Sequence, residues 1–185
     1  MKSAFGDEII EVSAHDIELL KKKAAASPLR RDRICLHRQP DDPVQEMIIA
    51  FTCESYVRPH RHIEKTESFH VIEGRLLVVF FDDAGRIRRV VRMAASETNL
   101  TFVYRLSADL WHSVVPLSEF VVIHETVKGH FAKHLTEFPD WAPINGDLPG
   151  IARWYSGLKN ELEAILKTDA PPGAGIDVKD RLQSQ

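Results

Sequence analysis

The stretch PHRHIEKTESFHVIEG, residues 59–74, decides the interpretation of this chain, and it contains three of the nine histidines. A β-strand rises about 3.3 Å per residue and alternates its side chains between two faces, so His60 and His62 should project together, about 6.6 Å apart at Cα. Both imidazoles could then reach one divalent ion at the usual bond length of about 2.1 Å. The stretch therefore predicts a metal site.

Two further residues are candidate ligands. Glu67 opens an apolar run that ends at Gly74, and its carboxylate would face the histidines if the chain turned between His62 and Glu67. His112, in the segment DLWHSVVP at 109–116, is the candidate for a fourth ligand. The competing interpretation is a polar cluster without a metal, or for His112 a structural hydrogen bond. Unpaired buried polar groups are costly, which favours metal binding.

The spacing of His60, His62, Glu67 and Gly74 resembles the first motif of the cupin superfamily, H-x-H-(x)4-E-(x)6-G, and His112 is similar to the histidine of the second motif. More narrowly, residues 13–145 resemble the WbuC-type cupin-fold metalloproteins, which are often encoded among surface-polysaccharide biosynthesis genes. The matching words are DDPVQ (41–45), VRPHRH (57–62), GRL (74–76), FDDAGR (81–86), WH (111–112) and WAP (141–143). The resemblance implies a cupin fold and a bound metal, but no particular reaction.

The chain also departs from the two cupin motifs. The first motif usually has glycine six residues before its first histidine, where this chain has Glu54. The second has proline and glycine three and five residues before its histidine, where Asp109 and Ser107 stand. Glycine accepts a positive φ that other residues tolerate less well, so the sequence leaves the orientation of His112 open.

Bulk properties exclude several classes of protein. A length of 185 residues with 44% hydrophobic and 28% charged residues is typical of one soluble globular domain. The net charge of −3 gives no general attraction to nucleic acid or to an anionic membrane. No membrane-length segment or signal peptide is visible, and Cys35 and Cys53 form no disulfide framework. We therefore expect a cytoplasmic protein in which Cys53, by strand parity, is buried.

The predicted elements are those of an all-β protein. Residues 13–16 read as a capping box that opens a helix ending at Ser27, and at least eight short strands follow. This pattern predicts a single cupin domain, a double-stranded β-helix or jelly-roll barrel, with an N-terminal helix and a C-terminal helical extension. The expected boundaries are a tail at 1–12, the cupin domain at 13–145, and an extension at 146–185 with a helix at about 157–168 and then a mobile tail.

Candidate catalytic residues are the two glutamates Glu67 and Glu125. His124 and Glu125 are adjacent on one predicted strand, so only one of them can face inward. Resemblance to the family's F-E-x-x-x-G pattern favours Glu125 as the pocket residue, while a solvated face is the alternative. Glu67, if loosely bound to the metal, could also carry a proton.

Candidate substrate-binding residues are Arg58, Lys65 and Trp111. Arg58 has the strand parity of His60 and could meet an anionic substrate at the rim, or form a surface ion pair instead. Trp111 could be a sugar platform, although tryptophan more often serves packing. The cluster of Arg86, Arg88, Arg89 and Arg92 is predicted to be a solvated strand face.

We expect His70 not to be a ligand. Along a strand, Glu67, Phe69 and Val71 share one face, whereas His70 lies on the other. If Glu67 points at the metal, His70 must point away unless a β-bulge intervenes.

The sequence thus predicts a cupin with one divalent metal ion per chain, with iron, manganese, zinc and nickel all possible. The gene context of the resembling family implies a small polar ligand, such as a sugar or sugar nucleotide. If the protein is an enzyme, a metal-dependent isomerase, epimerase or oxygenase is expected. The alternatives are a non-catalytic ligand-binding or sensor cupin and a metal-free sugar-nucleotide isomerase that uses histidine as a base.

Beyond the small-molecule ligand, the partner we expect is a second copy of the chain. Jelly-roll sheets have edges to protect, and the N-terminal strand and the helix at 158–166 could each cover a partner in a homodimer. No nucleic-acid or membrane partner is expected.

Overall fold

The computed structural model describes residues 9–96, 98–129 and 135–168, so residues 1–8 of the tail predicted at 1–12, and the mobile tail predicted after the second helix, lie outside the described residues. The strands are β1 (Arg31–Cys35), β2 (Val44–Thr52), β3 (Arg61–His62), β4 (Glu67–Glu73), β5 (Arg75–Phe81), β6 (Ile87–Ala94), β7 (Val103–Leu106), β8 (Trp111–Pro116), β9 (Phe120–Lys128) and β10 (Thr136–Glu137), and the helices are α1 (Ala14–Ala26) and α2 (Leu148–Thr168).

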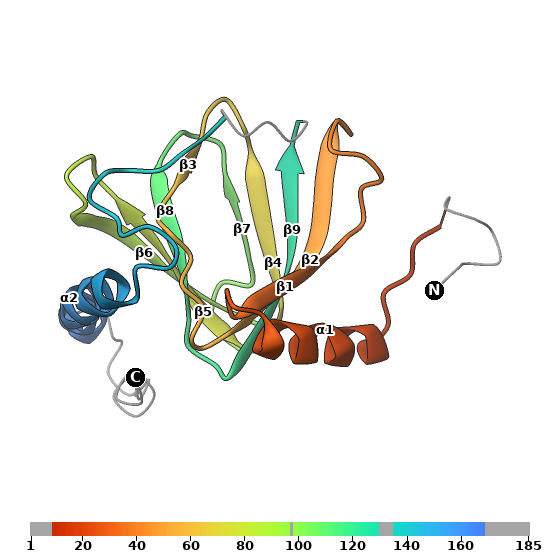
Figure 1. Ribbon diagram of the computed structural model, residues 1–185, viewed down its shortest axis with the longest axis horizontal. Helices are drawn as coiled ribbons and strands as arrows, with labels where there is room; N and C mark the ends of the chain where they lie inside the picture. Colours follow the sequence, from red (N-terminus) through yellow and green to blue (C-terminus); the bar gives the residue numbers. More distant parts are fainter. Residues whose placement is uncertain (1–8, 97, 130–134, 169–185) are drawn as a thin grey trace.

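Two antiparallel sheets pack face to face (Figure 1). The larger has the strand order β1-β2-β9-β4-β7 and the smaller β6-β5-β8, while β3 pairs with β10 in a short ribbon. Strands distant in sequence are neighbours in both sheets, as in a jelly roll. Alternate residues of the two sheets meet in the core, for example Phe69 and Ile123 of the larger sheet with Val78 and Val114 of the smaller. The predicted all-β cupin jelly roll is confirmed.

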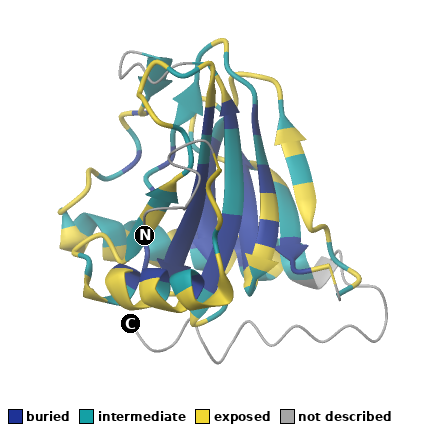
Figure 2. Ribbon diagram, turned by 90° about the vertical axis from the view of Figure 1, so that its right-hand side faces the viewer, coloured by how far each residue is buried: buried dark blue, intermediate teal, exposed yellow. Residues whose placement is uncertain are grey.

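Helix α1 covers the outer face of the larger sheet. Its buried residues Ile17, Leu20 and Ala24 pack against Ile48 and Ala50 of β2. The predicted capping box is present at its start, because the side chains and amides at positions 13 and 16 bond reciprocally. In Figure 2 the buried residues follow the strands between the layers and the inner side of this helix.

Helix α2 begins at Leu148, earlier than the predicted start near residue 157. The Asp147 carboxylate accepts a hydrogen bond from the Gly150 amide at 3.0 Å, and Pro149 lies in the first turn, where no partner for a backbone N–H is needed. The pattern of apolar residues detects only the later part of the helix, because its first turns present few buried side chains.

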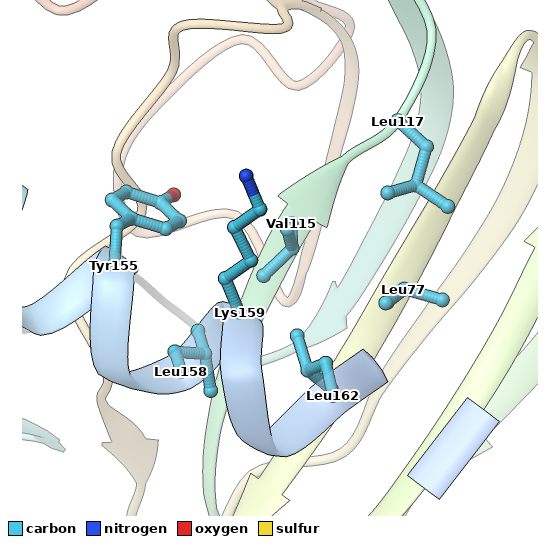
Figure 3. Close-up of a pocket in the computed structure, with 7 residues that line it drawn as sticks. All are labelled: Leu77, Val115, Leu117, Tyr155, Leu158, Lys159 and Leu162. Carbon is cyan, nitrogen blue, oxygen red and sulfur yellow. The ribbon is translucent and has the colours of Figure 1, made fainter. Parts of the chain in front are cut away.

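The packing of α2 explains why β5 is apolar on both faces. Leu158 and Leu162 of the helix pack on Leu77, Val79 and Val115, on the outer face of the smaller sheet. Figure 3 shows the small gap that remains there, with a cavity volume of about 10 Å³. The apolar side of α2 is therefore used within the chain, which removes one of the two surfaces predicted to cover a partner subunit.

Cys53 is exposed, so its predicted burial is wrong. Strand β2 ends at Thr52, and the alternation that would have buried residue 53 does not continue past that point. Cys35 is also exposed, and both thiols are free. Neither described helix is long and apolar enough to span a membrane.

Candidate metal centre

The backbone brings His60 and His112 together. The His60 amide donates to the His112 carbonyl oxygen at 3.0 Å, and the His112 amide donates to the His60 carbonyl oxygen at 2.8 Å. These two residues form an isolated antiparallel bridge between the start of β3 and the start of β8. The predicted fourth candidate ligand is thus held beside the first by main-chain hydrogen bonds.

The turn between His62 and Glu67 passes through Glu64, which has a φ of +56°. The Glu64 amide donates to Asp109 Oδ1 at 3.1 Å. Asp109 occupies a position where the second cupin motif usually has proline, and here its carboxylate connects the loop before β8 to the turn after β3. This contact replaces the local geometry that the motif residues would otherwise provide.

Four candidate ligands converge at this point. The ligand nitrogens of His60, His62 and His112 all lie within 4.8 Å of one another. Glu67 is 2% exposed, and its Oε1 lies 3.1 Å from His112 Nε2 while its Oε2 lies 3.4 Å from His62 Nε2. The structure brings together all four residues selected from the sequence.

Two of the histidines have their tautomer set by a main-chain carbonyl. His60 Nδ1 lies 2.9 Å from the Arg58 carbonyl oxygen, and His112 Nδ1 lies 2.9 Å from the Leu110 carbonyl oxygen. A carbonyl oxygen can only accept, so Nδ1 carries the proton in each ring, and in the neutral ring the Nε2 lone pair is free. Metal-ligating histidines typically have such a partner on the second ring nitrogen.

The third histidine is oriented by the short ribbon. His62 Nδ1 lies 3.1 Å from the Thr136 hydroxyl oxygen, and the two residues are direct partners in the pairing of β3 with β10. Thr136 was not identified from the sequence as part of the site, because the pairing joins segments more than seventy residues apart.

Two buried polar atoms of the cluster have no hydrogen-bond partner among the described residues. They are Glu67 Oε2 and His112 Nε2. Leaving a buried polar atom unpaired is costly, and native structures contain few such atoms. A divalent cation would satisfy both, so the donor set fits a metal ion.

The electrostatics of the cluster favour a neutral His60 and an ionised Glu67 carboxylate. Burial, reinforced by the neighbouring His112 and His62, lowers the pKa of His60 to about 3. Burial alone would raise the pKa of Glu67, but the charge of His112 and polar contacts with His112, His62 and Tyr104 hold it well below its usual value. Burial would lower the pKa of His112, but the Glu67 carboxylate outweighs it and raises that pKa.

Tyr104 was not identified from the sequence as part of the site. Its hydroxyl donates to Glu67 Oε1 at 2.7 Å. Tyr104 lies on β7, which pairs with β4, the strand that carries Glu67. Burial and the charge on Glu67 raise the pKa of Tyr104 well above its usual value, so the phenol keeps its proton. A lone tyrosine in an apolar strand gives no signal of this role.

Glu125 faces the barrel interior, as predicted. It alternates with the core residues Ile123 and Val127 on β9, whereas His124 lies on the opposite face with its Nε2 3.3 Å from Glu46 Oε1. Burial and the nearby Glu67 carboxylate raise the pKa of Glu125 to about 8.

The raised pKa of Glu125 predicts that the stability of the metal-free protein falls as pH rises. The unfolded carboxyl titrates near 4.5 and the folded one near 8, so the folded state binds the additional proton and loses stability as pH increases between these values. Glu125→Gln should remove this loss and be more stable than wild type by up to about 5 kcal/mol at pH 9, with little difference at pH 4.5. Urea unfolding at both pH values measures the change.

The exposed Glu161→Gln provides the matched control for that experiment, since it removes a carboxylate on α2. A stability difference between wild type and Glu125→Gln that stays the same from pH 4.5 to pH 9 would contradict the prediction.

The three candidate substrate-binding residues have different surroundings. The Arg58 guanidinium lies 4.8 Å from the Phe138 ring centroid and donates to the Pro139 carbonyl oxygen at 3.3 Å. Lys65 is half-buried, and burial lowers its pKa. Of the three, only Trp111 lines a cavity of about 820 Å³ to which β6 and β7 also contribute.

His70 lies outside the cluster, which confirms the parity argument. Its side chain is exposed and its ring lies 6.0 Å from that of Phe102. Strand β4 does contain a register shift, but only between Val71 and Glu73, after the residues concerned. Glu67 and His70 therefore stay on opposite faces.

Comparisons with known proteins address the fold. A family described as a domain of unknown function (DUF6016) matches residues 12–93, less than half of the chain. Among curated proteins, none matches this sequence.

Similar solved structures include the cupin domain of Cnp3 from Schizosaccharomyces pombe, with 12% identity, a TM-score of 0.44, and coverage of 54% of this chain and 65% of that one. KdgF from Halomonas sp. is similar with 16% identity, a TM-score of 0.44 and coverage of 59% and 86%. Oxalate decarboxylase from Bacillus subtilis has 14% identity, a TM-score of 0.44 and coverage of 58% and 27%. The match thus spans just under two thirds of the Cnp3 domain.

None of these three structures is described as a WbuC-type protein, so that narrower resemblance remains a hypothesis. The strand order, the bridged histidines and the orphaned Glu67 oxygen are properties of this chain itself. Taken together, they make the described chain an all-β jelly roll with a histidine cluster that could hold a metal ion.

Proposed function

We propose that this protein binds one divalent metal ion through His60, His62, His112 and the carboxylate of Glu67. The observation that carries the proposal is a cluster of three imidazoles, two of which lie against the buried Glu67 carboxylate, with Glu67 Oε2 and His112 Nε2 lacking hydrogen-bond partners among the described residues. Three nitrogens and one oxygen suit Fe(II), Mn(II), Zn(II) or Ni(II).

The charge balance supports the same conclusion. Glu67 is ionised although it is almost completely buried, and a buried carboxylate requires a counter-charge. In the metal-free protein the nearest source is a proton on His112, whose pKa is raised by Glu67. A bound cation would supply that charge without the proton.

When bound, such an ion supplies a Lewis acid with coordination positions left for water or a ligand. The surrounding residues keep the donors in place: Tyr104 holds Glu67 through Oε1, and Thr136 lies against the second ring nitrogen of His62. Glu125 retains a proton near pH 7 and, from the neighbouring strand, faces the same interior. It is the residue best suited to give or take a proton there.

The ligand that we propose is a small polar molecule, such as a sugar or sugar nucleotide. Support for this class comes from the WbuC-type resemblance and its surface-polysaccharide gene context. A metal-dependent isomerase, epimerase or oxygenase is the enzymatic form of the proposal, and a ligand-binding or sensor cupin is the non-catalytic form. The raised pKa of Glu125 favours the enzymatic form, because a general acid or base works best with a pKa near the operating pH.

A homodimer remains part of the proposal. The end strands of the larger sheet, β1 and β7, each pair with one strand only among the described residues and could pair with a second copy.

Elemental analysis of protein purified without added metal, followed by loading with each of the four metals, tests the proposal. We expect close to one ion per chain for at least one of them. Incubation of the loaded protein with sugars and sugar nucleotides then separates the two forms, since an enzyme yields product and a sensor yields only a bound ligand. Failure of all four metals to reach stoichiometric occupancy would refute metal binding.

A further inference from the structure

A large cavity lies between the edges of the two sheets. Its volume is about 820 Å³, and β6 of the smaller sheet and β7 of the larger contribute to its wall. This size falls within the range of small-molecule sites. Phe80, Val91 and Tyr104, which belong to the core or pack against it, reach its inner end.

The cavity adjoins the candidate metal centre. Tyr104 lines the cavity while its hydroxyl donates to Glu67. Phe80 also lines the cavity, and its ring centroid lies 6.2 Å from that of His112. A molecule in the cavity would therefore approach the cluster from the side of these two rings.

A β-bulge brings two arginines to the same wall. Phe80 pairs with Arg89 but Phe81 pairs with Ile87, so Arg88 is the additional residue on β6. In a regular strand Arg88 and Arg89 would point to opposite faces, but a bulge redirects one side chain. Both residues line the cavity. Both side chains are nevertheless exposed, so the prediction of a solvated face holds for these two.

The other two arginines of that cluster are engaged elsewhere. Arg86 forms an ion pair with Asp82 at 2.7 Å, and Arg92 donates to the Leu166 carbonyl oxygen near the end of α2 at 3.1 Å. Only the bulged pair is directed to the cavity.

The carboxylates of the cavity wall are already occupied. Asp82 is bound by Arg86 and by two backbone amides. Asp83 accepts the Trp111 Nε1 hydrogen at 2.9 Å, and Asp109 accepts the Glu64 amide. Arg86 neutralises Asp82, whereas Asp83 and Asp109 accept from neutral N–H donors and keep their charges without forming an ion pair to the bulged arginines.

The cations of the wall are less completely paired. Arg61 has an ion pair with Glu137 at 2.6 Å, but within the described residues Arg88, Arg89 and Arg105 have no carboxylate within ion-pair distance. Arg105 donates only to the Ser107 hydroxyl, at 3.1 Å. Outside ion pairs, the wall carries the three guanidinium groups of Arg88, Arg89 and Arg105 against the two carboxylates of Asp83 and Asp109, an excess of one positive charge, although the whole chain has a net charge of −3.

We propose that this cavity binds a small organic anion, with its phosphate or carboxylate group against Arg88, Arg89 and Arg105. Guanidinium groups bind both anions through paired N–H donors, which makes arginine suited to either. The remainder of the molecule would lie toward Trp111 and Tyr104, the latter beside the metal centre. Any contact of the bound anion with a metal ion rests on the proposed function, but the binding of the anion by the arginines does not.

Isothermal titration of the metal-loaded protein with three probes of the same ring tests the inference. Glucose 1-phosphate, glucuronate and glucose differ in whether they carry a phosphate, a carboxylate or no charge. We expect at least one charged probe to bind about 10-fold or more tighter than glucose. The probe that binds more tightly identifies the anion.

The double variant Arg88→Gln/Arg89→Gln should lose this preference. Lys22→Gln/Arg153→Gln is the matched control, because it removes the same charge from exposed helix positions. Equal binding of glucose, retention of the preference in the arginine variant, or no binding of any probe would overturn the inference.

Repeating the titration with metal-free protein separates the two proposals. Anion preference without any metal binding supports the cavity inference while the proposed function fails. Stoichiometric metal with no anion preference supports the function and overturns the cavity inference.

Discussion

Replacing His60 or His62 by alanine should lower the affinity for a divalent ion by more than about 100-fold, because each change removes one of four converging donors. Loss of a residue that merely orients a ligand costs about 10- to 100-fold, so loss of a ligand itself should exceed that range. Metal content after dialysis, together with competition against a chelator of known affinity, measures the change.

His70→Ala is the matched control, since the residue lies on the same stretch of chain but on the opposite, exposed face of β4. We expect this variant to keep close to one ion per chain. If all three alanine variants lost metal equally, the ligand set built on strand parity would be wrong.

Replacing Gly74 by alanine should destabilise the protein by about 3 kcal/mol or more. Gly74 has a φ of +81°, and a Cβ there would overlap the Phe120 carbonyl oxygen and lie 3.2 Å from the Val121 Cα. Backbone atoms of β9 cannot move aside without disturbing its pairing with β2 and β4. The free energy of unfolding from urea titration of the metal-free variant measures the cost.

Gly129→Ala is the control that contains only the backbone-conformation part of this effect, so the difference between the two variants gives the steric part. Gly129 has a φ of +92° but no atom within 4 Å of a Cβ placed on it, so only the backbone conformation is strained. The expected loss is about 1–2 kcal/mol, the usual cost of a left-handed conformation for a residue with a Cβ. Equal destabilisation by the two substitutions would show that the close approach of Phe120 is unimportant.

Local periodicity was sufficient to place His60 and His62 together and to exclude His70. Side-chain direction along a strand depends only on the number of residues between two positions, so these placements follow from spacing. The position of Glu67 also required a turn after His62, and the choice of Glu125 over its neighbour His124 came from the resemblance to the family's F-E-x-x-x-G pattern. Helix α1 was also predictable, because its capping box is a contact within a few residues.

Features that depend on strand pairing were not predictable in this way. The positions of Tyr104 and Thr136 beside the site follow from pairs formed between distant segments. Asp109, a departure from the cupin motif, proved to hold the turn at Glu64. Cys53 was misplaced because a strand end is set by its partners rather than by its own sequence.

The sequence by itself determined the succession of short strands and the faces on which His60, His62 and His70 lie, because these depend on spacing and alternation within one segment. The approach of His112 to His60 depended on the pairing of distant segments. Only the tertiary structure decided that α2 covers the outer face of β5 and that Arg88 and Arg89 share one cavity wall. The bulge that directs them there is a mismatch in length between β6 and β5, and a mismatch exists only once two strands have paired.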